Sequence, residues 1–287
     1  MMKQTIVKLK RVFALTMGAL LMACAPVNPS PKDGVKVGDS SSLKSMVPAS
    51  SLEQAAARQY ADIKKKAGAK NALMPDTHPQ VIRLRTIAKK ILPHAEIWNP
   101  ESKKWQWEIN LIASDEVNAF CMPGGKIAFY TGILEKLKLN DDEVATIMGH
   151  EVAHALREHA RERIAKAQLT NIGANVVSQA LGLGSLGNQA LGQGLQLLGL
   201  SFSRSDEKDA DLVGMDLAAR AGYDPRAGIS LWQKMGQLNK EKPPEWLSTH
   251  PSGESRIYEI QRNLADVMPL YAKAKGTTID RLPEYRY

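Results

Sequence analysis

The stretch Gly149-His150-Glu151-Val152-Ala153-His154 decides how the rest of this 287-residue chain is interpreted. It lies in a strongly helical run. An α-helix turns about once every 3.6 residues, so side chains four apart lie on one face. His150 and His154 can therefore direct two imidazole nitrogens at one ion. Glu151 follows His150 directly, where its carboxylate can reach a water molecule on that ion. Two histidines and an adjacent carboxylate are typical of a zinc hydrolase with a general base.

Such a short pattern also occurs by chance, so the interpretation needs a further ligand from a second helix. Several carboxylates lie between residues 203 and 216, and two of them, Glu207 and Asp211, are four residues apart on one helix face. We expect Glu207 to bind the metal and Asp211 to accept the N–H of a ligand histidine, for which we choose His150. The alternative is a solvated acidic helix face without a metal.

The first 23 residues predict export from the cytoplasm. A basic segment ends at Arg11 and an apolar run follows to Ala23, as in a secretory signal peptide. Leu21-Met22-Ala23-Cys24 resembles a bacterial lipobox, which implies lipidation at Cys24 and an outer-membrane lipoprotein that faces the periplasm. Residues 24–50 are rich in Pro, Ser, Gly and Lys, and they are predicted to form a flexible tether.

Composition and charge restrict the classes of partner. The chain is 44% hydrophobic and 24% charged, which suits a globular domain. Its net charge is +8, and the segment before the apolar run holds four of its basic residues and no acidic one. No basic stripe interleaved with aromatic residues remains, which argues against nucleic acid as a partner. Of the two cysteines, Cys121 is left alone if Cys24 carries lipid, whereas the two could pair in an oxidising periplasm if it does not.

Periodicity predicts a mostly helical α+β domain over residues 51–275, with a C-terminal tail at 276–287. We expect helices over 51–66, 78–91, 132–137, 140–165 and 205–221, and strands over 105–111, 117–122 and 126–131. Residues 170–200 combine glycine with Leu, Ala, Gln and Asn, and they are interpreted as a helical hairpin of small residues that covers the cleft as a lid. A buried helix pair is the alternative.

Four motifs, taken together, resemble one known family. They are H-E-x-x-H at 150–154, Ser-Arg-Ser-Asp-Glu-Lys-Asp-Ala-Asp at 203–211, Thr-His-Pro at 249–251 with Arg256, and Asn-Ala-Phe at 118–120 with Pro-Gly-Gly at 123–125. This set is similar to the CAAX-prenyl-protease and HtpX type of zinc metallopeptidase, a gluzincin family, over residues 75–262. The periplasmic lipoprotein members are a better match than the integral-membrane ones.

The resemblance implies a zincin-like fold and one Zn²⁺ ion per chain. His150, His154 and Glu207 would be the zinc ligands, Glu151 the catalytic base, and Asp211 a support for a ligand. The resemblance also implies that a small mixed or antiparallel sheet has an edge strand lining the cleft.

That edge strand would contain Asn118, Ala119 and Phe120 and would bind an extended substrate. This agrees with the general rule that a strand added to a sheet edge is recognised through its main chain.

Three further residues carry separate expectations. His250 precedes a proline in a loop, where it could donate to the oxyanion during catalysis or occupy a fourth zinc position and hold the enzyme latent; a turn that merely packs is the alternative. His159 is five residues past His154, and on a continuous helix it would turn away from the ligand face to the surface. Cys121 lies in the proposed cleft strand, where its thiol could touch zinc, although a Cys in a strand is more often a small buried hydrophobe.

The sequence therefore predicts a tethered periplasmic zinc endopeptidase of protein quality control. Its expected partners are extended or misfolded protein substrates, the outer membrane through the N-terminal lipid, and other envelope proteases or assembly machinery. The competing hypothesis is a membrane-tethered chaperone or assembly factor with a latent zinc site.

Overall fold

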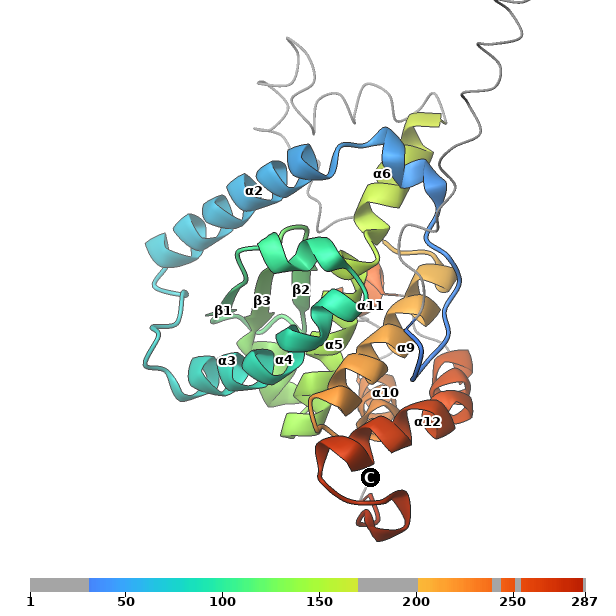
Figure 1. Ribbon diagram of the computed structural model, residues 1–287. Helices are drawn as coiled ribbons and strands as arrows, with labels where there is room; N and C mark the ends of the chain where they lie inside the picture. The colour runs from blue at the N-terminus through green and yellow to red at the C-terminus, as the bar shows by residue number, and fades with distance from the viewer. Residues whose placement is uncertain (1–30, 170–200, 239–243, 251–253, 286–287) are drawn as a thin grey trace, which may run out of the picture.

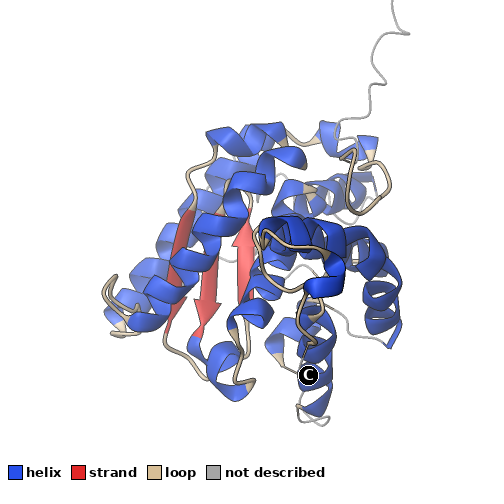
Figure 2. Ribbon diagram, turned by 60° about the horizontal axis from the view of Figure 1, so that its bottom comes forward, coloured by secondary structure: helices blue, strands red, loops and turns tan. Residues whose placement is uncertain are grey.

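A three-stranded sheet lies at one side of the molecule, next to the helix that carries the opening motif. The computed structural model describes residues 31–169, 201–238, 244–250 and 254–285. In this part the strands β1 (Glu108–Ile112), β2 (Ala119–Met122) and β3 (Lys126–Tyr130) follow the order β1-β3-β2. β1 pairs with β3 in parallel and β2 pairs with β3 antiparallel, so the sheet is mixed and β2 is at its edge (Figure 2).

The two faces of the sheet pack against different helices, because side chains alternate along each strand. On one face, Phe120 and Ala128 contact Tyr60 of α2 (Ala49–Ala69). On the other face, Ile127 and Phe129 belong to the main core, which includes α3 (Pro79–Ile91) and α5 (Asp141–Leu156). Figure 1 shows α2 on the opposite side of the sheet from α3 and the short α4 (Thr131–Lys136). The predicted α+β class is confirmed.

Helix α5 begins as predicted and ends earlier than predicted. Asn140 and Glu143 form a reciprocal capping box at its N-terminus. Leu156 is its last residue, and Glu158 has a left-handed φ of 59°. A new helix, α6 (His159–Leu169), begins after this break. The prediction of one continuous helix to residue 165 was therefore wrong, since periodicity does not reveal a single residue in the left-handed region.

Helix α9 (Arg204–Arg220) crosses α5 at very close range. The two helices meet at Gly149 and Gly214, where a Cβ built on Gly149 would lie 2.5 Å from the carbonyl oxygen of Gly214. α9 starts with a capping box between Ser203 and Asp206 and is followed by Gly222 at φ 80°, as the sequence predicts. Two glycines at the crossing thus bring the backbones of the two helices into contact.

Shorter and later elements complete the helical side of the molecule. These are α10 (Ala227–Gln237), α11 (Glu245–Thr249) and α12 (Glu254–Ala274), which follow α9 in the chain. α12 packs against α9, and α10 packs against α5 and α12 (Figure 1). None of the helices in the described ranges is both long enough and apolar enough to cross a membrane.

The described part of the N-terminal segment is packed rather than free, which differs from the flexible tether predicted over 24–50. Val35 and Val47 are fully buried, and the short helix η1 (Ser42–Met46) lies against α6. Lys44, buried in η1, forms an ion pair of 2.8 Å with Glu158. Composition alone did not reveal these contacts. The predicted signal peptide, Cys24 and the predicted lid at 170–200 lie outside the described residues.

Strand boundaries also differ from the prediction at β1. The alternation from Trp105 suggests a strand from that residue, yet β1 starts at Glu108. The indole N–H of Trp105 donates to Glu53 of α2, and that of Trp107 donates to the carbonyl of Ser102. Residues 105–107 thus lie outside the strand, and the indoles of Trp105 and Trp107 bind groups outside the sheet.

Candidate metal centre

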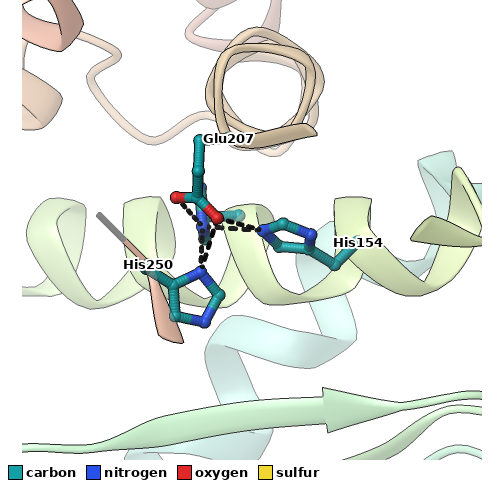
Figure 3. A group of neighbouring side chains, drawn as sticks. His154, Glu207 and His250 are labelled. Atoms are coloured by element: carbon teal, nitrogen blue, oxygen red, sulfur yellow. Dashed lines mark hydrogen bonds and ion pairs between the residues drawn. The ribbon is translucent and has the colours of Figure 1, made fainter. Parts of the chain in front are cut away.

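Four side chains from three parts of the chain converge next to the place where α5 and α9 cross. They are His150, His154, Glu207 and His250, and each offers one ligand atom within 4.8 Å of the others. Helical spacing stacks His150 and His154, whose Nε2 atoms are 3.0 Å apart. Glu207 comes from the first turn of α9 and His250 follows α11, and their side chains point toward His154 (Figure 3). We call these four residues the quartet.

The ligand atoms of the quartet lie as close together as the ligands of one metal ion would. His150 Nε2 lies 3.1 Å from His250 Nδ1 and 3.6 Å from Glu207 Oε2. Glu207 Oε1 lies 3.4 Å from His154 Nε2 and 3.0 Å from His250 Nδ1. All four side chains are at most 4% exposed. Each pair of residues predicted from the sequence to meet at the metal therefore does meet in the fold.

The hydrogen bonds around the quartet show why a cation fits it. His150 Nδ1 lies 3.0 Å from Asp211 Oδ1, and an ionised carboxylate can only accept, so the proton of His150 is on Nδ1 and a lone pair is on Nε2. His250 turns Nε2 toward Glu151, at 3.5 Å, and Nδ1 into the quartet. The lone pair of His150 Nε2 thus faces an oxygen of Glu207 and Nδ1 of His250. Acceptors this close repel unless a cation lies between them, and imidazole with carboxylate is a ligand set of Zn²⁺.

A second layer of charge holds the carboxylates in place. Arg256 of α12 donates to Glu207 Oε2 at 2.5 Å and to both oxygens of Asp211 at 2.5 and 2.6 Å. Its guanidinium lies 3.8 Å from the ring centroid of Trp232. The expected partnership of Asp211 with His150 is present in the structure. Arg256, noted in the sequence only as part of a motif, is the residue that joins Asp211 to Glu207.

Protonation in the quartet favours metal binding. Burial opposes ionisation of Glu207, but the imidazoles of His154 and His250 beside it lower the pKa of its carboxyl far below the ordinary range. Burial lowers the pKa of the His154 imidazole well below its ordinary value. At neutral pH the site therefore presents a carboxylate and a neutral imidazole, which are the forms that bind metals.

Glu151 lies next to the quartet without belonging to it. Its carboxylate is 2% exposed and accepts a hydrogen bond of 2.6 Å from the indole N–H of Trp246. Trp246 lies in α11 and stacks on the ring of His250, with 5.0 Å between centroids. Nothing in the sequence around Trp246 indicated this contact, because the two residues are brought together only by the position of α11 against α5.

His159 is buried, so the prediction of a surface residue was wrong. Its side chain is at most 5% exposed, and its Nδ1 lies 3.0 Å from His154 Nδ1. The break at Glu158 turns α6 and brings the ring back toward His154, whereas a continuous helix would have turned it away. His159 Nε2 also lies 3.0 Å from Asp209 Oδ2. Helical periodicity places His159 at the surface only if the helix continues past Glu158, which it does not.

The predicted substrate strand lies beside α5. Ala119 and Phe120 belong to β2, and Asn118 precedes it, with its carbonyl accepting from the amide of Tyr130. Ala119 and Phe120 are 1% and 6% exposed, so their side chains serve the core and only their backbone is available at the sheet edge. Cys121 is partly buried against the main core, as expected, and burial raises the pKa of its thiol well above its ordinary value.

A hollow opens beside His154. It spans about 390 Å³, including space that is open to solvent, and lies between α2, β2 and α6. Its lining includes Leu52, Trp105, Cys121, His154 and Phe202. The ring of Phe202 lies 3.9 Å from the His154 centroid, and its amide donates to the carbonyl of Thr249. The hollow places open space at one side of the quartet.

Comparison with known proteins agrees with this geometry. The model of peptidase family M48 matches residues 80–264. The mitochondrial metalloendopeptidase OMA1 of Schizosaccharomyces pombe is 32% identical over 72% of this chain and 58% of its own length. OMA1 of Arabidopsis thaliana is 40% identical over 52% of this chain and 30% of its own length. The beta-barrel assembly-enhancing protease of Yersinia pestis is 29% identical over 62% of this chain and 38% of its own length. Each match thus spans less than two thirds of the relative. The chain belongs to peptidase family M48.

Proposed function

We propose that this protein is a zinc-dependent endopeptidase of the bacterial cell envelope that hydrolyses unfolded or misassembled periplasmic and outer-membrane proteins. One observation carries the proposal: the buried quartet of nitrogen and oxygen donors lies beside the carboxylate of Glu151. A structural zinc site is closed by its ligands and has no use for an adjacent base. Membership of a peptidase family supports the same conclusion.

The chemistry follows from the positions of the side chains. A bound zinc ion would supply a water molecule with a pKa of about 7 and would polarise the peptide carbonyl. Trp246 holds Oε1 of Glu151, which leaves Oε2 to accept a proton from water. The same carboxylate can then pass this proton to the leaving amine. Glu151 would thus act as general base and then as general acid, while His150, His154 and Glu207 would hold the ion.

The contacts of His250 favour a latent enzyme, in which His250 binds the metal, over a role as donor to the oxyanion. An oxyanion donor must present an N–H to the reacting carbonyl, but both ring nitrogens of His250 already face residues of the site: Nδ1 lies 3.1 Å from His150 Nε2 and 3.0 Å from Glu207 Oε1, and Nε2 lies 3.5 Å from Glu151 Oε1. We infer that His250 would be a fourth ligand of a bound metal ion. It would have to move away before a peptide carbonyl could enter.

The substrate class is inferred from the edge strand. Backbone groups of β2 recognise an extended chain whatever its sequence, and a folded protein does not offer one. The envelope location rests on the signal peptide and Cys24 lipobox features of the sequence, and it is supported by a relative named as a beta-barrel assembly-enhancing protease. The relatives named as mitochondrial, such as OMA1 of Schizosaccharomyces pombe at 32% identity, are no less similar and do not favour this location. Envelope proteases or assembly machinery remain proposed partners.

A second candidate function is a membrane-tethered chaperone or assembly factor with a latent site. The observation that favours it is the filled quartet, in which His250 takes the position that a substrate needs and Glu151 is almost fully buried. In this case the edge strand would bind unfolded chains without cleaving them.

Cleavage of an unfolded protein distinguishes the two candidates. The purified, zinc-loaded protein is incubated with casein and with a stably folded protein of similar size, and Glu151→Gln is the control. We expect fragments from casein alone and only from the wild type. If both forms suppress aggregation of a denatured protein and neither produces fragments, the chaperone is the correct function.

A further inference from the structure

His159 has no role in the proposed reaction, yet it contacts a residue of the quartet. It is buried on the first turn of α6, between His154 on one side and Asp209 of α9 on the other. Both contacts are 3.0 Å long and join ring nitrogens to their partners. A buried histidine with two polar contacts of this length has little freedom to rotate or to exchange its proton with water.

The positions of the protons in this chain of contacts can be assigned from hydrogen-bond chemistry. Asp209 is paired with the guanidinium of Arg157, whose Nε donates to Oδ2 at 2.6 Å, so its side chain is an ionised carboxylate. An ionised carboxylate only accepts, so His159 Nε2 carries the N–H. A neutral imidazole has one N–H, and His159 Nδ1 is therefore an acceptor. His154 must donate to it from Nδ1.

This assignment leaves the lone pair of His154 on Nε2, the atom that faces Glu207 and the rest of the quartet. We propose that His159, oriented by Asp209, is a positioning residue that fixes the tautomer and ring orientation of His154 for metal binding. The inference rests on the proposed metal site. Through His159, Asp209 fixes the proton of His154 on Nδ1, just as Asp211 fixes the proton of His150 on Nδ1 by direct contact.

Asp209 is itself held by more than His159. Arg157, in the break between α5 and α6, donates from Nε to Asp209 Oδ2 at 2.6 Å. Another nitrogen of the same guanidinium donates to the carbonyl of Gly38 in the N-terminal segment. The side chains of Arg157 and Asp209 are 2% and 16% exposed, so most of this pair is shielded from solvent. Asp209 and His159 are thus anchored outside the quartet, which a positioning role requires.

The tautomer can be measured without a metal. Spectra that correlate ring ¹⁵N with carbon-bound ¹H distinguish Nδ1–H from Nε2–H, and the chain has only six histidines. In the metal-free wild type we expect His154 as Nδ1–H. His159→Phe removes the acceptor, and the signals should show loss of this single tautomer. His159→Gln should preserve it, because its amide oxygen accepts from His154 and its amide N–H donates to Asp209.

Zinc affinity is the second measurement, made by titration of Zn²⁺ into the metal-free protein. Loss of such a supporting contact typically weakens metal binding by roughly 10–100-fold, which we expect for His159→Phe and not for His159→Gln. His94→Phe, which replaces a half-buried histidine outside the site, is the matched control and should bind as the wild type does. Thermal unfolding of the metal-free variants reports folding separately, and His159→Ala replaces His159→Phe if the latter does not fold.

An unchanged tautomer and affinity in His159→Phe would overturn the inference, and so would a Gln variant as weak as the Phe variant. A wild type that binds no zinc would instead refute the proposed function. The metal-free spectra would still decide the role of His159 in that case.

Discussion

The crossing of α5 and α9 at Gly149 and Gly214 gives a prediction whose size follows from the structure. In Gly149→Ala the new Cβ would lie 2.5 Å from the carbonyl oxygen of Gly214 and 3.1 Å from its carbon. Ordinary contact requires the helices to separate by about 1 Å. Both contacts are to backbone, so no side chain can rotate away. Overpacking of this kind costs about 1–3 kcal/mol.

The same separation would also affect the metal centre, because His150 follows Gly149 and Glu207 lies on the opposite helix. A shift of about 1 Å in a catalytic group can lower activity by about a hundredfold. For a domain of this size, the loss of stability corresponds to a fall in Tm of roughly 2–12 °C. We therefore expect lower Tm and weaker zinc binding together.

Thermal unfolding and zinc titration of the purified variant measure the two effects, and Gly236→Ala is the matched control. Gly236 is in α10, and a Cβ there meets nothing within 4 Å. Replacement of a helical glycine by alanine then stabilises by roughly 0.5–1 kcal/mol. We therefore expect Gly149→Ala to lower Tm and Gly236→Ala to raise it. If Gly149→Ala unfolded at the wild-type temperature with unchanged zinc affinity, the close crossing would be refuted.

Three other variants test separate contacts. Arg256→Met leaves Glu207 and Asp211 as buried carboxylates without their cation, and urea unfolding of the metal-free protein should show a loss of about 3–5 kcal/mol; a loss no larger than that of a surface ion pair would contradict this account. His250→Ala should weaken zinc binding and speed casein cleavage, whereas slower cleavage with unchanged affinity would favour the donor role. The lowered pKa of Asp209 gives stability that is complete above its unfolded pKa of about 3.9 and is lost as pH falls through its native pKa. The destabilisation caused by Asp209→Asn should therefore shrink toward pH 2, and a difference that does not vary with pH would disprove this.

The sequence predicted those parts of the site that depend on spacing within one helix. His150 and His154, four residues apart, and Glu207 and Asp211, also four apart, lie on the faces that helical periodicity assigns to them. The capping residues and the glycine after α9 follow local rules in the same way. Local physical rules thus accounted for His150, His154 and Glu207, whereas the position of His250 at the quartet depends on how the loop after α11 packs.

Other contacts depend on how distant segments pack, and periodicity gave no information on them. His159 was assigned to the surface because one left-handed residue, Glu158, redirects the chain. Trp246 reaches Glu151 across 95 positions of sequence, and Arg256 reaches Glu207 across 49. The N-terminal segment has the composition of a linker, yet Val35 and Val47 are buried in it. Only the fold brings these groups together.

Reconstitution of the metal-free protein with zinc tests the central claim most directly. Cleavage of an unfolded substrate is measured while Zn²⁺ is added stepwise, and bound metal is measured in the same samples, for the wild type and Glu151→Gln. We predict that wild-type activity rises in proportion to bound zinc until one ion per chain is present, and that Glu151→Gln binds the same ion with activity lower by roughly 10²–10⁴-fold. Full activity in the metal-free wild type, or equal activity in the two zinc-loaded proteins, would contradict a metal centre served by Glu151.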